Sequence, residues 1–498
     1  MGVLSNLEPK KVFEYFEAIC GIPHGSGNVE KLSDYLVAFA KERNLQVIQD
    51  EVKNVIIIKE ATPGYENEPT VVLQGHMDMV AVKKPDCNID MKTEGLRLSV
   101  DGDDIYAEGT SLGGDDGIAV AYALALLDSD TIKHPRLEVI ITVDEEVGMD
   151  GAMAIDLSML KGNRLLNLDS EDEGIFLTSC AGGARAACRL SFSMHESKGI
   201  LVEININGLQ GGHSGVEIHH ERGNSNCLMG RVLWSLQAKM PVCLVNVDGG
   251  LADNAIPRET KAVVLIPEGS DLCAELLKKP TEPTVLENTL EDLMMDISDE
   301  LATKDPGFAM SWKRGNEITE VVAVSAEDTA KAVAFLVAMP NGVQSISADV
   351  KGLVETSLNM GMLKLYKEEA ALEAVFAVRS SVESAKAALL DKLAAIVKLT
   401  GGTCSVTGNY PGWVYRVDSP LRDKMIAIFK EMYGSEPKVE AIHAGLECGI
   451  LGSKIKDLDC VSIGPDMKDI HTTEERLSIS STKRVWEYLV KVLETKEA

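Results

Sequence analysis

Acidic and imidazole side chains stand directly after short apolar segments of this sequence or at the start of a helical one. They are His76, Asp78, Asp115, Glu145, Glu146, Asp169 and His471. Imidazole nitrogens combined with carboxylate oxygens suit zinc, cobalt or manganese, whereas calcium and magnesium sites are built from oxygen alone. The residue types therefore predict a site for transition-metal ions.

The same residues match the needs of a site with two metal ions. Ions about 3.5–4 Å apart need one bridging carboxylate and further ligands on either side. His76 and Asp169 are expected to bind one ion. Glu146 and His471 are expected to bind the other, with Asp115 as the bridge.

Asp78 and Glu145 are the members of this set that are left without a metal ion. Asp78 lies two residues after His76 in an extended segment, so both side chains share a face and the carboxylate could fix the imidazole tautomer. Glu145 could accept a proton from the attacking water as the general base. Because Glu145 and Glu146 are successive residues of an extended backbone, their side chains should point in different directions.

An α/β scaffold is expected to position these side chains. Residues 9–20 and 29–43 carry apolar residues at helical spacing, and residues 115–130 form a helical segment rich in small apolar residues. Short β-branched segments lie between them. Near-continuous apolar strands that are separated by helices predict a largely parallel sheet. In such sheets ligands bind beyond the carboxyl ends of the strands, which is where most of the candidate ligands stand.

The pattern changes in the middle of the chain. The segment "LVEININGL" alternates polar and apolar residues, as a half-solvated antiparallel strand does, and several helices are expected in residues 270–340. We therefore expect two domains. Residues 1–187 and 405–498 form a catalytic α/β domain, and residues 188–404 form an inserted α+β domain.

Composition and charge exclude several classes of function. The chain has 498 residues, of which 45% are hydrophobic, and 49 basic against 77 acidic residues give a net charge of -28. This balance argues against nucleic acids and anionic membranes as partners, because phosphate groups are bound by basic patches. The sequence shows no export signal, no apolar run of about 18 residues, and ten cysteines without a CxxC pair. We therefore expect a cytoplasmic protein with reduced thiols.

The motifs around these residues resemble those of a known family. Four segments of the chain resemble successive motifs of the dinuclear-zinc aminoacylase and carboxypeptidase superfamily: "GHMDMV", "GTSLGGDDGIAV", "TVDEEVGMDGA" and "NLDSEDEG". Four further segments narrow the resemblance to the aminoacyl-histidine dipeptidases, also called cytosol non-specific dipeptidases. They are "GLQGGHSGVEIH", "DNAIPRE", "HAGLECGIL" and "SIGP". It implies an α/β, zinc-peptidase-like catalytic domain with a mixed, largely parallel sheet, interrupted by an α+β lid domain.

The resemblance also implies roles for the residues of the metal site. It gives the ligands the same distribution over two zinc ions, makes Glu145 the general base and makes Asp78 the partner of His76. It further implies a cis peptide bond between Asp115 and Asp116. Close relatives have Asn after the bridging Asp, where this chain has Asp116, so Asp116 stays open as an alternative ligand.

The inserted domain is expected to supply the second half of the site. By the same resemblance, His213 stabilises the oxyanion of the tetrahedral intermediate and Asn254 contacts the substrate. Arg379 binds the carboxylate at the C-terminus of a dipeptide, for which a guanidinium offers two hydrogen bonds. Gly445 and Glu447 are expected to line the substrate pocket.

The predicted function is hydrolysis of dipeptides with a free N-terminus, among them Xaa-His and β-alanyl-histidine. Two divalent ions per chain, zinc or else cobalt or manganese, are expected to activate the water whose proton Glu145 accepts. Two alternatives stay open: an N-acyl-amino-acid deacylase or tripeptidase, and an inactive metal-binding module. The sequence also leaves open the native metal, the side-chain preference, the role of His443, and whether a homodimer lets His213 serve a neighbouring chain.

Overall fold

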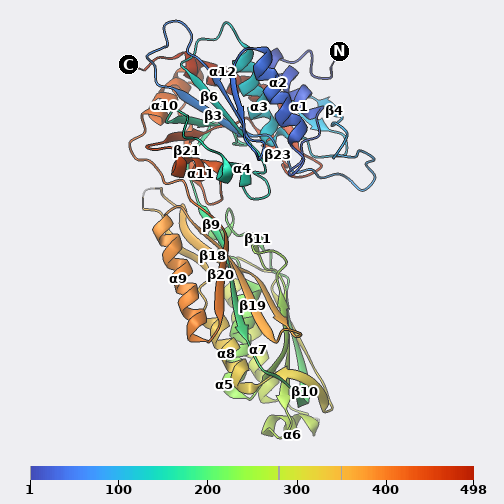
Figure 1. The fold of residues 1–498 in the computed structure, drawn as a ribbon. Helices are drawn as coiled ribbons and strands as arrows, with labels where there is room; N and C mark the ends of the chain where they lie inside the picture. Colours follow the sequence, from blue (N-terminus) through green and yellow to red (C-terminus); the bar gives the residue numbers. More distant parts are fainter. Residues whose placement is uncertain (1, 279–280, 349, 498) are drawn as a thin grey trace. The chain divides into compact units, whose positions relative to one another are not determined.

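The chain divides into two compact units in the computed structural model, which describes residues 2–278, 281–348 and 350–497. Unit 1 consists of Met1–Cys180, Trp413–Ala441 and Leu446–Ala498, and unit 2 consists of Ala181–Gly412 and Ile442–Gly445. Figure 1 colours the first part of unit 1 blue to teal and its last part red, with unit 2 in green to orange.

The divisions between the units differ by several residues from the boundaries expected at 187/188 and 404/405. They lie at 180/181 and 412/413, and the segment Ile442–Gly445 also belongs to unit 2. The reason is that β9 (Gly182–Ser191) and β20 (Thr403–Tyr410) pair with each other in the sheet of unit 2. A sequence pattern does not show where a strand leaves one sheet for another.

Unit 1 is built on an eight-stranded sheet with the order β1-β2-β6-β3-β7-β22-β8-β21. Its strands are β1 (Gln46–Gln49), β2 (Val55–Lys59), β3 (Val71–His76), β6 (Leu137–Thr142), β7 (Arg164–Asn167), β8 (Ile175–Cys180), β21 (Lys438–Ile442) and β22 (Asp459–Ser462). The central strands β6, β3, β7 and β22 are parallel, and antiparallel pairs flank them. The mixed sheet with a parallel centre agrees with the buried, apolar strands of the sequence.

Helices cover one face of this sheet. Alternate apolar residues of β2, β3 and β6, such as Ile57, Leu73 and Val139, belong to one hydrophobic cluster with the helices. These helices are α1 (Lys10–Cys20), α2 (Glu30–Glu42), α3 (Gly114–Asp128), α10 (Pro420–Tyr433) and α12 (Ile479–Glu494). Figure 1 shows α1, α2, α3 and α12 beside β3 and β6. From Gly117 to Leu127, α3 is buried on all sides, as its small apolar residues predicted.

A small sheet and two short helices complete unit 1. The small sheet contains β4 (Leu98–Asp101), β5 (Asp104–Ala107), β23 (Met467–Lys468) and β24 (Arg476–Ser478). The short helices α4 (Asp150–Ala154) and α11 (Glu447–Lys454) pack on each other. His471 lies in the loop between β23 and β24, so the small sheet fixes both ends of the loop that carries it.

Unit 2 contains a ten-stranded antiparallel sheet with helices on one face. Its main order is β15-β10-β14-β12-β18-β19-β9-β20, with β16 paired to β10 and β17 to β18. The strands not yet given are β10 (Met194–Asn207), β12 (Cys243–Gly249), β14 (Thr260–Pro267), β15 (Ala309–Arg314), β16 (Thr319–Val324), β17 (Gly342–Ile346), β18 (Val354–Tyr366) and β19 (Ala371–Ser380). The predicted alternation of "LVEININGL" is confirmed, since β10 alternates buried and partly exposed residues there.

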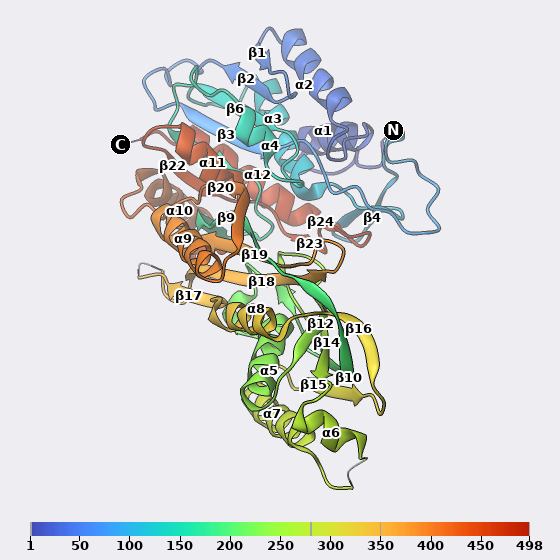
Figure 2. The same cartoon turned by 60° about the horizontal axis from the view of Figure 1, so that its bottom comes forward.

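The helices of unit 2 share one core with this sheet. They are α5 (Ser225–Lys239), α6 (Asp271–Leu277), α7 (Val285–Leu301), α8 (Ala326–Ala338) and α9 (Glu383–Leu399). Figure 2 shows α5, α8 and α9 lying along the strands. A two-stranded ribbon of β11 (Gly212–His213) and β13 (Ala255–Ile256) and the short 3-10 helix Ile218–His220 complete the unit. No helix in the residues that the structure describes has the length and apolar character that a membrane crossing requires.

His134, just before β6, is a fully buried imidazole in unit 1. Its Nδ1 lies 2.8 Å from the carbonyl oxygen of Pro135 and must therefore donate, while Nε2 has no hydrogen-bond partner among the described residues. Burial lowers the pKa of His134 below its usual value. The ring is therefore harder to protonate in the native state than in the unfolded chain, which protonates it below about pH 6.5.

We predict that His134 makes unit 1 less stable in mild acid. Since the native pKa is lowered, its contribution is present above about pH 6.5 and falls as the pH drops, by at most about 1.4 kcal/mol per pH unit. His134→Asn keeps a donor toward Pro135 but does not titrate, so its unfolding free energy should fall less between pH 7.5 and 5.5. Guanidinium unfolding at both pH values measures this. An equal fall in wild type and variant would contradict it, and exposed His195→Asn is the control.

Candidate metal centre

The carboxyl ends of parallel strands bring the predicted metal ligands together. His76 is the last residue of β3, Glu145 and Glu146 follow β6, and Asp169 follows β7. In the sheet His76 lies opposite Thr142, the last residue of β6. Asp115 comes from the start of α3 and His471 from the loop after β23. Donor atoms form three groups whose members lie within 4.8 Å of one another: His76 with Asp116 and Asp169, His76 with Glu145 and Glu146, and Asp115 with Glu146 and His471.

The ring of His76 is oriented through its Nδ1 atom. Nδ1 lies 2.9 Å from the main-chain oxygen of Asp78 and 3.5 Å from the Oδ1 atom of the same residue. Because a carbonyl oxygen only accepts hydrogen bonds, Nδ1 carries a proton and donates it. In the neutral ring Nε2 therefore has a free lone pair. This Nε2 atom lies 3.1 Å from Asp115 Oδ1 and 3.5 Å from Asp169 Oδ1, so the three atoms are close enough to bind one metal ion together.

The carboxylate of Asp115 lies between two imidazoles. Its Oδ1 is 3.1 Å from Nε2 of His76, and its Oδ2 is 3.1 Å from Nε2 of His471. Nε2 of His471 also lies 2.9 Å from Glu146 Oε1. One oxygen toward each histidine is the arrangement that a carboxylate needs in order to bridge two ions. The peptide bond between Asp115 and Asp116 is cis, as expected.

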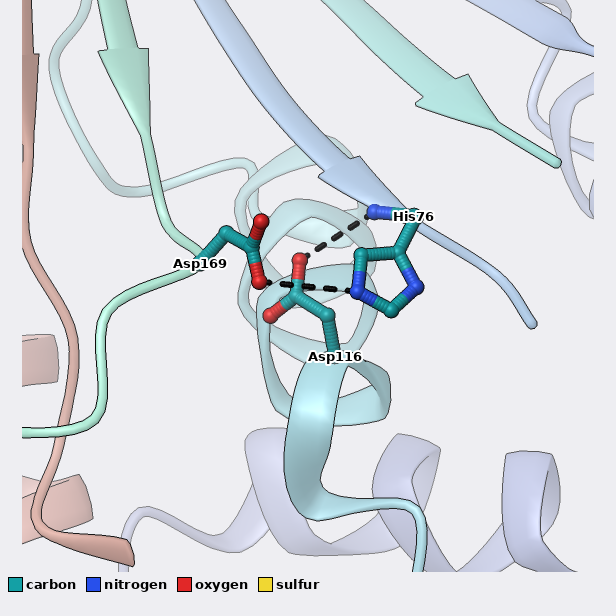
Figure 3. Close-up of side chains that lie close together, drawn as sticks. All are labelled: His76, Asp116 and Asp169. Carbon is teal, nitrogen blue, oxygen red and sulfur yellow. Dashed lines mark hydrogen bonds and ion pairs between the residues drawn. The ribbon is translucent and has the colours of Figure 1, made fainter. Parts of the chain in front are cut away.

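Asp116 takes a different position, which Figure 3 shows. Its Oδ2 accepts a hydrogen bond of 3.1 Å from the main-chain N–H of His76, and a Cβ atom on Gly75 would lie 2.5 Å from that oxygen. A carboxylate oxygen of Asp116 lies within 4.8 Å of the donor atoms of His76 and Asp169, so the distances also allow Asp116 as the alternative ligand. Asp115 contacts both histidines, however, and the geometry therefore favours it as the bridge.

The carboxylate of Asp78 holds the turn that carries both glutamates. It accepts the main-chain N–H of Glu145 at 3.1 Å and that of Glu146 at 3.4 Å, and the Ser26 hydroxyl at 2.8 Å. Glu146 reaches His471, whereas the Glu145 carboxylate accepts no hydrogen bond from the residues that the structure describes. Asp78 thus supports His76 with its main chain and the glutamates with its side chain, and Glu145 is left free.

The electrostatics of the cluster are those of buried acids close together. Burial, then the nearby acid Asp169, raises the pKa of Glu145 well above its usual range, although His76 opposes the shift. Burial also raises the pKa of Asp169 to about 6. Hydrogen bonds to Asp115 and Glu146 raise the pKa of His471 to about 10. Excess negative charge in a buried place favours bound positive charge, which protons or divalent cations can supply.

The donor set fits two divalent ions of the transition-metal type. It offers the Nε2 atoms of two histidines and the carboxylates of Asp115, Glu146 and Asp169, without a sulfur ligand. Mixed nitrogen and oxygen donors suit zinc, cobalt and manganese. Since Nδ1 of His76 is already engaged, Nε2 is available for a metal ion without any change of the ring.

Glu475 positions the loop of Asp115, a role that no sequence motif predicted. Its side chain is 3% exposed, and its oxygens accept the main-chain N–H groups of Leu112, Gly113 and Gly114 at 2.7, 3.1 and 2.8 Å. Glu475 follows His471 by four residues, so one short segment supplies a ligand and also fixes the loop of the bridging carboxylate. An acid in "HTTEERL" was visible, but its partners are far away in sequence.

Glu447 does not line an open pocket within unit 1. Its side chain is fully buried and accepts hydrogen bonds from Gln74 and Thr142. Burial raises the pKa of Glu447 to about 8. Pocket lining was expected from the resemblance, and the difference arises because Glu447 is the first residue of α11 and points into the sheet, where it meets β3 and β6.

In unit 2, the backbone fixes the tautomer of His213. Nδ1 accepts the main-chain N–H groups of Gly215 at 3.2 Å and Val216 at 3.1 Å, so the proton of the ring resides on Nε2. Burial, then the charge of Arg379, lowers the pKa of His213, which keeps the ring neutral. Asn254 lies beside it, since its carbonyl oxygen accepts the N–H of Ser214 and the next residue pairs with His213. His213 is thereby prepared to donate a hydrogen bond.

Arg379 and His443 lie close to His213 within unit 2. A Cβ atom on Gly215 would lie 3.0 Å from His213 Cε1, 3.1 Å from Arg379 Nε and 2.5 Å from the carbonyl oxygen of His443. Nε of Arg379 and Nδ1 of His443 are buried without a hydrogen-bond partner in the described part of the chain. His443 Nε2 bonds Ser357, and burial lowers the pKa of His443 to about 3. Gly445 follows in the same loop.

The chain is similar to known peptidases in sequence and in fold. The sequence model of Peptidase family M20/M25/M40 matches residues 72–495. The cytosol non-specific dipeptidase of Escherichia coli (strain K12) is 35% identical over 496 residues, which cover 99% of this chain and 99% of that protein. The crystal structure of aminoacylhistidine dipeptidase from Vibrio alginolyticus has a TM-score of 0.89 at 35% identity and covers 99% of each chain.

A more distant structure shares the fold alone. A tripeptidase from Staphylococcus aureus has a TM-score of 0.53 at 15% identity and covers 98% of each chain. The family match and the full-length relative confirm the resemblance that the motifs indicated, including an α/β fold with a mixed sheet. This chain belongs to peptidase family M20/M25/M40 and is a hydrolase that acts on peptide bonds.

Proposed function

We propose that this chain is a dinuclear metal-dependent dipeptidase that cleaves dipeptides with a free N-terminus. The observation that carries the proposal is the Asp115 carboxylate between the Nε2 atoms of His76 and His471, with the unengaged carboxylate of Glu145 nearby. The names of the relatives from Escherichia coli and Vibrio alginolyticus, both dipeptidases at 35% identity, support dipeptides as the substrate class. Xaa-His dipeptides and β-alanyl-histidine are the first candidates.

Two zinc ions, or else cobalt or manganese, fit the donors. His76, Asp115 and Asp169 would hold one ion, and Asp115, Glu146 and His471 the other. When bound, the ions supply positive charge that polarises the scissile carbonyl and makes a water molecule more acidic. Asp78 keeps the His76 ring and the Glu145–Glu146 turn in place for this task.

Glu145 accepts the proton of the attacking water and returns it to the leaving amine. Burial raises the pKa of Glu145 well above its usual range, so its carboxylate holds an accepted proton more readily than an exposed glutamate does. Asp78 fixes the main chain of Glu145, while the Glu145 carboxylate accepts no hydrogen bond within the described part of the chain. Glu146 differs because it reaches His471 and serves as a ligand.

Unit 2 supplies groups that recognise the substrate. His213, with its proton on Nε2, donates a hydrogen bond to the oxygen that becomes negative when water adds to the carbonyl. Arg379 binds the C-terminal carboxylate, for which its unpartnered Nε–H is suited. Asn254 and Gly445 contact the substrate from neighbouring loops. We propose that unit 1 is the catalytic domain and that unit 2 is the substrate-binding lid. We also propose that the protein is located in the cytoplasm, in line with the name of the E. coli relative.

We predict opposite defects for the two adjacent glutamates. Glu145→Gln should keep two metal ions per chain but reduce kcat by about 10²–10⁴-fold, the usual contribution of a general base. Glu146→Gln should lose about one ion per chain after dialysis, because a neutral amide is a poorer ligand for a divalent ion. Elemental analysis and steady-state kinetics on β-alanyl-histidine measure both effects. Wild-type turnover in Glu145→Gln would remove Glu145 as the base.

His213 should act on turnover rather than on the metal. His213→Ala should reduce kcat about 10²–10³-fold, as loss of an oxyanion donor does, with the metal content unchanged. His219→Ala is the matched control, since His219 is an exposed histidine in the neighbouring turn. If His213→Ala raised KM and left kcat unchanged, His213 would be a binding group and not the oxyanion donor.

A substrate panel tests the dipeptidase activity directly. The enzyme with added Zn²⁺, Co²⁺ or Mn²⁺ should cleave β-alanyl-histidine and unmodified dipeptides at least about tenfold faster than tripeptides or N-acetyl amino acids, a preference worth about 1.4 kcal/mol. Removal of metal with a chelator should abolish the activity, and added ions should restore it. Cleavage of N-acetyl amino acids alone would replace the dipeptidase by a deacylase, and equal cleavage of tripeptides would replace it by a tripeptidase.

A further inference from the structure

Glu447 is part of a polar network buried beneath the candidate metal centre. Its Oε2 accepts hydrogen bonds from Gln74 Nε2 at 2.5 Å and from Thr142 Oγ1 at 2.6 Å. Gln74 Oε1 in turn accepts Asn167 Nδ2 at 2.6 Å. All four side chains are at most 1% exposed, so solvent does not satisfy their polar groups. The network joins the start of α11 to three neighbouring strands of the sheet.

The network lies directly behind the residues proposed for chemistry. Gln74 precedes His76 by two residues on β3, and Asn167 precedes Asp169 by two residues at the end of β7. Thr142 is the last residue of β6 and lies opposite His76. Since side chains two residues apart on a strand share a face, Gln74 and His76 point to the same side of the sheet. Gln74 is therefore the residue directly behind His76 on that face of β3.

Stability alone does not account for a glutamate at this position. Oε1 of Glu447 is buried without a hydrogen-bond partner in the part of the chain that the structure describes, which costs free energy. A hydrophobic residue of similar volume often serves a buried site as well or better. A buried carboxyl that keeps one unsatisfied oxygen and yet bonds two strand ends indicates a requirement for the site.

We propose that Glu447 is a positioning residue of the metal centre: it holds Gln74 and Thr142, and through Gln74 also Asn167, so that His76 and Asp169 lie where one ion binds. It acts through these residues and does not touch the substrate. Metal ligands need to be held within about 0.5 Å of their productive positions, and the hydrogen bonds of the strands do not fix side chains that well. This inference rests on the proposed function, because it assigns Glu447 to the same centre.

Titration of the metal-free protein with Co²⁺ alone tests the proposal without any substrate. Glu447→Leu removes the acceptor and should weaken binding of one ion at least about tenfold and alter the visible Co²⁺ absorption spectrum, since partners behind metal ligands typically contribute 10–100-fold in affinity. Glu447→Gln keeps an acceptor oxygen and the volume, so its affinity should stay within about threefold of wild type, a difference under 1 kcal/mol.

Glu138→Leu is the matched control for general destabilisation. Glu138 is a buried carboxylate at the other end of β6, where it bonds Arg136 and the N–H groups of Lys161 and Gly162. The metal-free variant should have a lower melting temperature than the wild type. With Co²⁺ bound, it should have the same absorption spectrum as the wild type. Gln74→Met breaks the network from the strand side and should reproduce the spectrum of Glu447→Leu, which keeps the test decisive if Glu447→Leu does not fold.

The outcomes separate the two proposals. Wild-type Co²⁺ affinity and spectrum in Glu447→Leu, or in Gln74→Met if Glu447→Leu does not fold, would overturn the positioning role while the dipeptidase activity stands. The same altered spectrum in Glu138→Leu would also overturn it, because general loosening would then explain the effect. If wild type bound no Co²⁺ and cleaved no dipeptide, the proposed function itself would fail.

Discussion

The contact of one carboxylate with two imidazoles is the constraint on which unit 1 depends. Asp115 meets Nε2 of His76 with one oxygen and Nε2 of His471 with the other, each at 3.1 Å. The three residues come from a strand end, a helix start and a loop near the C-terminus. Three features bring these residues together. They are the parallel centre of the sheet, the hydrogen bonds of Glu475 to the loop before Asp115, and the small sheet that fixes the loop of His471.

This arrangement concentrates negative charge where water is largely excluded. Buried carboxylates repel one another, and the raised pKa of Asp169 and Glu145 expresses that cost. A divalent cation removes the same cost, so metal binding and stability of this region are coupled. The residues that keep the acids in place are themselves polar and buried, such as Asp78 and Glu447. The buried acids are thus surrounded by an outer layer of hydrogen-bonded polar side chains.

Much of the centre could be predicted from sequence because its motifs are local. His76 ends a recognisable strand and Glu146 and Asp169 follow two others, and the carboxyl ends of such strands share one edge of a parallel sheet. The partners of Glu475 and Glu447 could not be predicted, since Leu112 and Gln74 lie hundreds of residues away and no spacing rule connects them. The division between the units was off by several residues for a related reason, because strand pairing is a tertiary property.

The fold of unit 2 was predicted less completely than that of unit 1. The sequence pattern of residues 270–340 predicted helices but not the strands β15 and β16, which also lie there. These strands lie on the outer side of β10, and more than half of their residues are exposed or half-buried, so they lack the apolar runs that mark central strands. Their place in the sheet is fixed by pairing with β10, which begins more than a hundred residues earlier.

The position of β22 in the chain has a consequence for biosynthesis. This strand is formed by residues close to the C-terminus, yet it lies between β7 and β8 in the middle of the sheet. A growing chain can complete most of unit 2 from the continuous stretch Ala181–Gly412, because domains generally fold as units during synthesis. The sheet of unit 1 stays open until β22 is made, and His471 follows later still. The candidate metal centre can therefore assemble only after the segment from β22 to His471 has been made.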